Sequence, residues 1–138
     1  MQSNFDSQQT IQQLIQIVGQ QHVLTQDHDT RLYRQGRRYG SGKVLAVVVP
    51  GTLFEQWQVL QAAVNADCIV IMQAANTGLT GGSTPFGDDY DRPVVLMSTR
   101  RLAGIQVINQ GQQVICLPGR SEEHTSELQS PDHLVCRL

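Results

Sequence analysis

Two uninterrupted apolar runs separated by a helical segment constrain the fold of this 138-residue chain more than any other feature. Residues 44–49 read Val-Leu-Ala-Val-Val-Val, and residues 68–72 read Cys-Ile-Val-Ile-Met. Runs without polar alternation are typical of strands buried on both faces, as in parallel sheets. Between the runs, Thr52 and Glu55 have the spacing of a capping box, which predicts that a helix begins there. Strand, helix and strand of these lengths predict a βαβ unit with a right-handed crossover.

The segment that joins the two runs carries apolar side chains at helical spacing. Its apolar positions are Phe54, Trp57, Leu60, Ala63 and Val64. Side chains three and four residues apart share one face of a helix, so we expect this face to pack on the core. We expect Trp57 to be a core anchor rather than a cofactor contact.

Two shorter helices are predicted ahead of the first apolar run. Asp6 precedes apolar residues at helical spacing and Gly19 follows them, which predicts a helix between an acceptor cap and a glycine stop. Thr25 is placed to cap a second short helix, with Asp27 and Asp29 in its first turn.

After residue 87 the pattern changes to short strands and tight turns. We expect strands at residues 93–97, 105–108 and 114–117, the last two joined by a hairpin at residues 109–111, which read Asn-Gln-Gly. A βαβ unit followed by antiparallel strands places the chain in the α+β class.

The loop that follows the second apolar run is the candidate ligand site. It holds four glycines among small polar residues: Gly78, Gly81, Gly82 and Gly87. Glycine lets a loop curl so that several backbone N–H groups can meet one anion. Composition alone favours an ordinary surface turn, but open α/β sheets bind ligands at the carboxyl ends of their strands, where this loop begins. The loop is neither a P-loop nor a Gly-x-Gly-x-x-Gly motif and has no lysine, so backbone dipoles and hydroxyl groups would hold any pyrophosphate.

Charge and cysteine usage limit the classes of partner. The formal net charge of −2 gives no electrostatic case for nucleic-acid binding. No segment is long and apolar enough for a membrane span or a signal core. Cys68 and Cys116 lie in strand-like runs, which indicates buried free thiols in a reducing compartment. We therefore expect a cytosolic chain, or one on the cytosolic side of a membrane. One basic cluster is expected to be a solvated surface segment rather than a phosphate or lipid contact: Arg31, Arg34, Arg37, Arg38 and Lys43.

Candidate metal ligands and catalytic groups are sparse. Asp88, Asp89 and Asp91 lack the ligand spacing of an EF-hand, so a solvated turn is the better interpretation. His22 and His28 stand apart from any cysteine or carboxylate pattern that would indicate a metal. We expect no metal site and assign no catalytic residue.

Several segments together form a motif more specific than the glycine loop: residues 45–51, 72–80, 82–85 and 89–92, followed by 94–95 and 98–99. With them, the chain over about residues 8–119 resembles the quinone-dependent D-lactate dehydrogenases. That family lies within the vanillyl-alcohol oxidase superfamily of PCMH-type FAD-binding proteins. The resemblance implies the N-terminal part of a PCMH-type FAD-binding domain, truncated near residue 119.

The resemblance also implies a cofactor, a reaction and a location. Family members bind FAD between two α+β subdomains, and the loop after the second strand wraps its pyrophosphate. They oxidise D-lactate to pyruvate by hydride transfer to the flavin and pass the electrons to quinone, bound peripherally to the cytoplasmic side of the inner (plasma) membrane. The substrate-binding cap and the membrane-contacting region of the family are expected to lie downstream of this chain. Carried over residue by residue, the cofactor-binding role falls on Ala74, Ala75, Asn76, Thr77, Gly78, Gly82 and Ser83.

Residues 120–138 depart from the family pattern. They resemble the in-frame translation of a common sequencing-library adapter, most clearly over residues 120–130 and 134–138. We therefore expect residues 1–119 to be a partial FAD-binding domain and residues 120–138 to be a non-native tail without a site.

Three hypotheses of function follow. In the first, the chain is an enzyme fragment that supplies the FAD pyrophosphate loop and is inactive alone. In the second, it is a self-contained nucleotide- or phosphate-binding module without catalysis, and in a third it is a structural domain whose loop binds nothing. A flavin titration separates them, and we expect no tight binding because one wall of the cofactor cleft would be missing.

Overall fold

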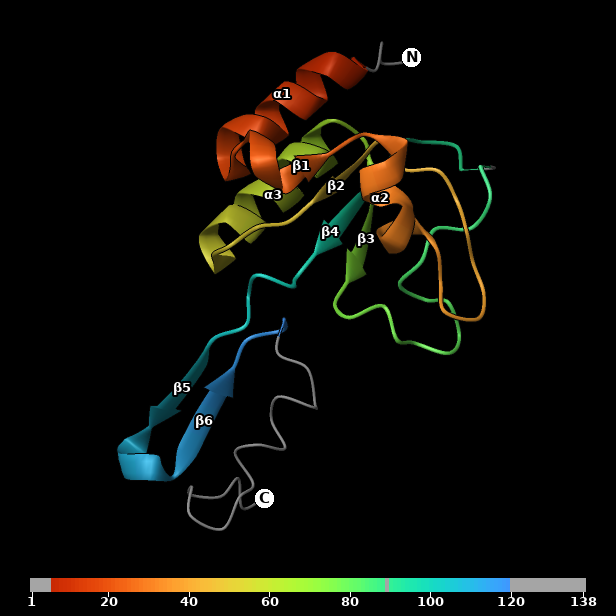
Figure 1. Cartoon of the computed structure of the whole chain (residues 1–138). Coiled ribbons are helices and arrows are strands. Elements are labelled where there is room, and N and C mark those ends of the chain that lie inside the picture. The colour runs from red at the N-terminus through yellow and green to blue at the C-terminus, as the bar shows by residue number, and fades with distance from the viewer. Residues whose placement is uncertain (1–5, 89, 120–138) are drawn as a thin grey trace.

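The computed structural model describes residues 6–88 and 90–119, so the expected tail at residues 120–138 lies outside the described residues (Figure 1). A four-stranded sheet carries helices on both faces, and a separate hairpin extends from it. The helices are α1 (Ser7–Val18), α2 (Asp27–Arg34) and α3 (Leu53–Asn65), with short 3₁₀ turns at Gln20–His22 and Asn109–Gly111. The strands are β1 (Val23–Leu24), β2 (Ala46–Val48), β3 (Ile69–Gln73), β4 (Val94–Ser98), β5 (Ile105–Ile108) and β6 (Gln113–Cys116).

Strand β4 is the centre of the sheet, whose order is β1-β2-β4-β3. It pairs in parallel with β2 on one side and with β3 on the other, and all five of its residues are buried. The predicted unit of β2, α3 and β3 is present, but β4 lies between its two strands. The expectation that pairing turns antiparallel directly after the glycine loop was therefore wrong for β4. It is correct for β5 and β6, which form an antiparallel hairpin.

Strand β3 is an edge strand, which corrects the expectation that its run is buried on both faces. Ile69, Val70 and Ile71 are half-buried and Met72 is 43% exposed. An apolar run reports burial, but it does not say which strand lies in the middle, because sheet order depends on contacts distant in sequence.

Two apolar layers hold the sheet. On one face, α1 and α3 pack through Leu14, Val59 and Ala63 against alternate residues of β2 and β4. On the other face, Val47, Val49 and Leu96 are covered from the side of α2, where Tyr33 packs on them. The period of two along each strand divides its side chains between these layers.

The helix termini follow local capping chemistry, with one correction. The Asp6 carboxylate accepts hydrogen bonds from the backbone N–H groups of Gln8 and Gln9, and Gly19 ends α1 with a φ of 85°. Both features confirm the prediction. Helix α2 begins one residue later than Thr25 would place it, with Gln26 at the cap and no side-chain cap bond. The first-turn acids of α2 favour this start because they interact with the positive end of the helix dipole.

The predicted core face of α3 was wrong in part. Ala63 and the unpredicted Val59 are fully buried, whereas Trp57 is 51% exposed and stacks on exposed Phe54 with ring centroids 5.6 Å apart. Leu60 and Val64 are also exposed. Small and β-branched residues let α3 lie close to α1 and the sheet, and a tryptophan at this interface would hold the helix away.

The hairpin of β5 and β6 confirms the predicted turn. Asn109, Gln110 and Gly111 all have positive φ values, of 51°, 56° and 89°. Asparagine and glycine tolerate this left-handed region, which is why the sequence signal for this turn is strong. The hairpin leaves Cys116 exposed, contrary to expectation, whereas Cys68 is buried as predicted.

Candidate functional site

The carboxyl ends of three parallel strands meet at one edge of the sheet, and the predicted ligand loop begins there. Strands β2, β4 and β3 end at Val48, Ser98 and Gln73. The loop of residues 74–83, hereafter the glycine loop, leaves directly from β3. In Figure 1 it lies on the same side of the sheet as α2.

Two side-chain amides fasten the glycine loop to the end of α2. The buried amide of Gln73 donates from Nε2 to the carbonyl oxygens of Tyr33 and Ser83, both at 2.8 Å. The amide of Asn76 donates from Nδ2 to the carbonyl oxygen of Gln35 at 2.7 Å. Last-turn helix carbonyls lack intrahelical donors, so these amides satisfy groups that the helix leaves unpaired. We call Gln73 and Asn76 the amide clamp.

The amide clamp changes the role of one predicted cofactor-binding residue. Oδ1 of Asn76 accepts from the hydroxyls of Thr84, at 3.0 Å, and Ser83, at 3.4 Å. With its amide nitrogen bound to backbone, the half-buried Asn76 side chain has both its nitrogen and its oxygen hydrogen-bonded within the chain. Its φ of 56° lies in the left-handed region that asparagine tolerates. The Asn76 side chain therefore shapes the loop, and only the backbone N–H of this residue remains available to a ligand.

The glycine loop offers a ligand mainly its backbone N–H groups. Within residues 6–88 and 90–119, no protein oxygen accepts a hydrogen bond from the backbone N–H groups of residues 74–83. Unpaired backbone donors are satisfied by water or by a ligand. A run of such groups in a curled loop is an anion-binding arrangement.

The glycines of this loop divide into two kinds. Gly81 has a φ of 74°, which a residue with a side chain adopts only under strain. Gly78 and Gly82 have no such constraint, and a Cβ built on either would meet nothing within 4 Å. Because neither conformation nor internal packing requires glycine at these two positions, they leave open room over the backbone. That room fits a group that approaches the loop closely.

The end of the central strand contributes groups that the sequence did not reveal. The Ser98 hydroxyl is fully buried and has no hydrogen-bond partner among the described residues. Thr99 donates to the carbonyl oxygen of Pro118 at 3.2 Å, and Arg101 donates to the carbonyl oxygen of Val49 at 2.8 Å. Only the position of β4 between β2 and β3 brings these residues to the edge, so local pattern could not have found them.

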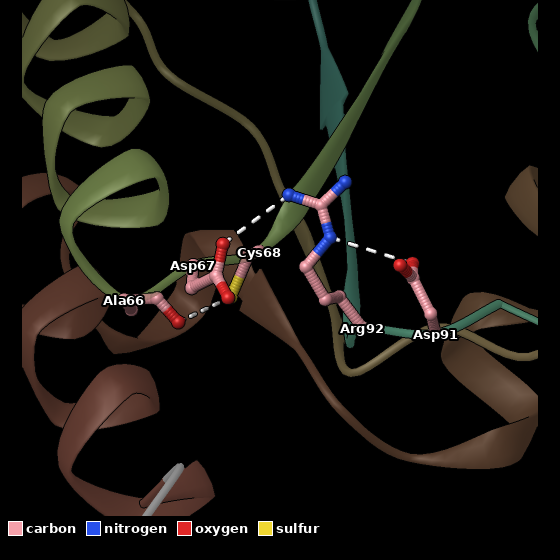
Figure 2. Close-up of polar contacts among 5 residues, drawn as sticks. All are labelled: Ala66, Asp67, Cys68, Asp91 and Arg92. Carbon is pink, nitrogen blue, oxygen red and sulfur yellow. Dashed lines mark hydrogen bonds and ion pairs between the residues drawn. The ribbon is translucent and has the colours of Figure 1, made fainter. Parts of the chain in front are cut away.

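The opposite, amino edge of the sheet is held by charges. Arg92 pairs with Asp67 at 3.2 Å and with Asp91 at 3.4 Å, as Figure 2 shows, and Lys43 pairs with Asp88 at 2.6 Å. A pocket of about 410 Å³ lies here, away from the glycine loop.

Burial and neighbouring groups shift pKa values at this edge. Burial raises the pKa of the Cys68 thiol, and the charge of Asp67 raises it further. The hydrogen bond from Lys43 lowers the pKa of the Asp88 carboxyl. Within the described residues, no group of three potential ligands is close enough to hold a metal ion, and no helix is long and apolar enough to cross a membrane.

Sequence comparison finds close relatives of one kind. The chain is 55% identical over 112 residues to the quinone-dependent D-lactate dehydrogenase of Haemophilus influenzae, and 53% identical over 114 residues to that of Escherichia coli. These matches cover 81% and 83% of this chain. The chain spans about a fifth of each relative, 20% in both cases. No family model matches the chain. The resemblance predicted from the sequence is confirmed over that part of the relatives.

Solved structures share the fold at low sequence identity. An alkyldihydroxyacetonephosphate synthase matches with a TM-score of 0.78 at 12% identity, covering 94% of this chain and 26% of that one. The 4-ethylphenol oxidase of Gulosibacter chungangensis matches with a TM-score of 0.71 at 18% identity, covering 92% of this chain and 25% of that one. A p-cresol methylhydroxylase matches with a TM-score of 0.68 at 14% identity, covering 92% of this chain and 25% of that one. The predicted fold, shared with part of each of these larger proteins, is confirmed.

Proposed function

We propose that this chain supplies the pyrophosphate-binding loop of an FAD-dependent D-lactate dehydrogenase that passes electrons to quinone. The observation that carries the proposal is a glycine loop with unpaired backbone donors, at the carboxyl edge of the sheet, in a chain 55% identical to a relative of that name. The fold and the loop chemistry support the same assignment independently of each other.

The residues present fit the diphosphate of such a cofactor. Backbone N–H groups of Ala74, Ala75, Asn76, Thr77, Gly78, Gly82 and Ser83 would bind its oxygens, and the open room at Gly78 and Gly82 would admit them. Anions bound by aligned backbone dipoles need no lysine. FAD, when bound, supplies the acceptor for a hydride from the substrate. This chain holds, orients and shields the diphosphate, and we assign it no catalytic residue.

The remaining parts of the proposal concern the whole enzyme. D-lactate and quinone would be its substrates, and it would bind peripherally to the cytoplasmic side of the inner membrane through regions outside this chain. Residues 1–119 would be the partial FAD-binding domain, and residues 120–138 a tail without function.

A chimaeric enzyme tests the proposal. Residues 8–119 of this chain would replace the matching segment of the Haemophilus influenzae enzyme. We expect the chimaera to purify with bound flavin, visible in its absorption spectrum, and to reduce a quinone analogue with D-lactate. A folded chimaera without flavin would contradict the proposal.

Two further measurements sharpen this test. In the chimaera, Gly82→Leu should fill the open room and abolish flavin binding, whereas Gly111→Ala in the distant hairpin turn should affect stability alone. Flavin titration of the chain by itself addresses the alternative of a self-contained nucleotide-binding module. We expect only weak binding there, and tight binding would favour the alternative.

A further inference from the structure

Two loops far apart in sequence are joined by backbone hydrogen bonds. The loop of residues 36–43, hereafter the basic loop, exchanges backbone hydrogen bonds with Gly87. Lys43 donates to the carbonyl oxygen of Gly87 at 3.1 Å, and Gly87 donates to that of Ser41 at 2.8 Å. Figure 1 shows the two segments running together beside α2. The basic loop is thus attached directly to the segment that continues the glycine loop.

The tip of the basic loop lies against the glycine loop itself. A turn closes where the N–H of Gly36 donates to the carbonyl oxygen of Gly40 at 2.8 Å. The tip of this turn carries Arg37, Arg38 and Tyr39. The carbonyl oxygen of Tyr39 is 3.5 Å from the point where a Cβ on Gly81 would lie. The two arginines are therefore one and two residues from the point where the basic loop approaches the glycine loop.

The two loops offer different groups to an anion. Arg37 and Arg38 are exposed, and no carboxylate of the described residues pairs with either. By contrast, Arg34 pairs with Asp27 and Lys43 with Asp88. Residues 74–87 contain no charged side chain at all. The glycine loop thus offers neutral backbone N–H groups, and the basic loop offers two positive charges that no described carboxylate neutralises.

We propose that Arg37 and Arg38 form the cationic wall of the anion site whose floor is the glycine loop. The ligand would be a diphosphate-bearing nucleotide; naming it FAD rests on the proposed function. Guanidinium groups bind phosphate oxygens through charge-assisted, often bidentate hydrogen bonds, which backbone dipoles alone do not supply. The basic cluster, expected from sequence to be a solvated surface segment, would be a ligand contact at these two positions.

The test is an NMR titration of the full 138-residue chain, which reports weak binding at individual amides. Probes are FAD, inorganic pyrophosphate and riboflavin, which lacks phosphate. We expect FAD and pyrophosphate to shift the amides of residues 37–39 and 74–83, and riboflavin to leave them unchanged. The double variant Arg37→Gln/Arg38→Gln should weaken pyrophosphate binding about tenfold and flatten its salt dependence, since charge-assisted contacts and their screening are lost together.

Matched variants identify the cause of any loss of pyrophosphate affinity. Arg31→Gln removes the same charge from an exposed position on α2 and should leave affinity unchanged, and Arg37→Lys/Arg38→Lys should recover most of it. Affinity within twofold of the parent chain in the double glutamine variant would overturn the cationic wall. A parent chain that binds no pyrophosphate would overturn the cationic wall, whereas the proposed function fails separately, if the folded chimaera retains no flavin. Pyrophosphate bound through both loops, with FAD shifting the amides of neither loop, would support the wall and reject FAD as the ligand.

Discussion

The two edges of the sheet are held by different chemistry. At the carboxyl edge, neutral amides of Gln73 and Asn76 bond to backbone carbonyls, and Gln73 is only 2% exposed. At the amino edge, Arg92 and Lys43 form ion pairs with side chains that are largely exposed to solvent. Buried hydrogen-bonding groups are costly to leave unpaired, whereas exposed ion pairs are weakened by water and by salt. The edge that carries the candidate site is therefore the more rigidly specified one.

The largest effect is expected from Gln73→Glu at neutral pH. A buried carboxylate would face the carbonyl oxygens of Tyr33 and Ser83 with no proton to donate, at a cost of about 3 kcal/mol. Urea unfolding measures the loss, and Gln106→Glu on the exposed face of β5 is the matched control. Because the protonated acid can donate one hydrogen bond, the difference from the parent chain should shrink as pH falls. A variant as stable as its control would refute the amide clamp.

A smaller but more local effect is expected from Asn76→Gly. Glycine keeps the positive φ of 56° but removes the amide, so the loss of the hydrogen bonds to Gln35 and Thr84 is isolated from backbone strain. We expect a loss of about 1 to 2 kcal/mol. Hydrogen exchange should accelerate at the amide of Thr84, which donates to the carbonyl oxygen of Gly81, and not in β4. Uniform acceleration throughout the sheet would show that Asn76 acts on the whole fold instead.

At the amino edge, Arg92→Gln should destabilise the chain less than either amide variant. Its two carboxylate partners are exposed, so solvent already screens the pairs. Urea midpoints at low and high salt provide the measurement, and the difference between variant and parent should vanish at about 1 M salt, where screening is short-ranged. A loss of stability that persists in high salt would place Arg92 among the structural residues of the fold.

The smallest effect is expected in how the stability of the folded chain falls at acidic pH. The hydrogen bond from Lys43 lowers the pKa of Asp88, so the pair stabilises the folded chain above the carboxyl's ordinary range, and this contribution is lost as pH falls through the lowered value. Asp88→Asn should remove that part of the acid dependence and leave stability at low pH unchanged. Urea midpoints at several acidic pH values test it, and an unchanged slope would contradict the assignment.

Local chemistry was readable from the sequence, whereas sheet order and side-chain roles were not. The Asp6 cap, the turn at residues 109–111 and the loop after β3 were predicted because each depends on a few neighbouring residues. The central place of β4 and the exposure of Trp57 depend on packing between distant segments. The clamp role of Asn76 was hidden for the same reason, since its partners, Leu32 in α2 and Gln35 directly after it, lie about 40 residues earlier in the chain.

The central position of β4 has a consequence for the order in which this fold can form. Strands β2 and β3 share no pairing with each other, and each pairs in parallel with β4. A growing chain that has reached residue 93 thus contains both flanking strands and the crossover helix, but not the strand that joins them. Parallel pairing between distant segments is slow to nucleate. Completion of the sheet therefore waits for a short apolar segment that is synthesised after the ligand loop.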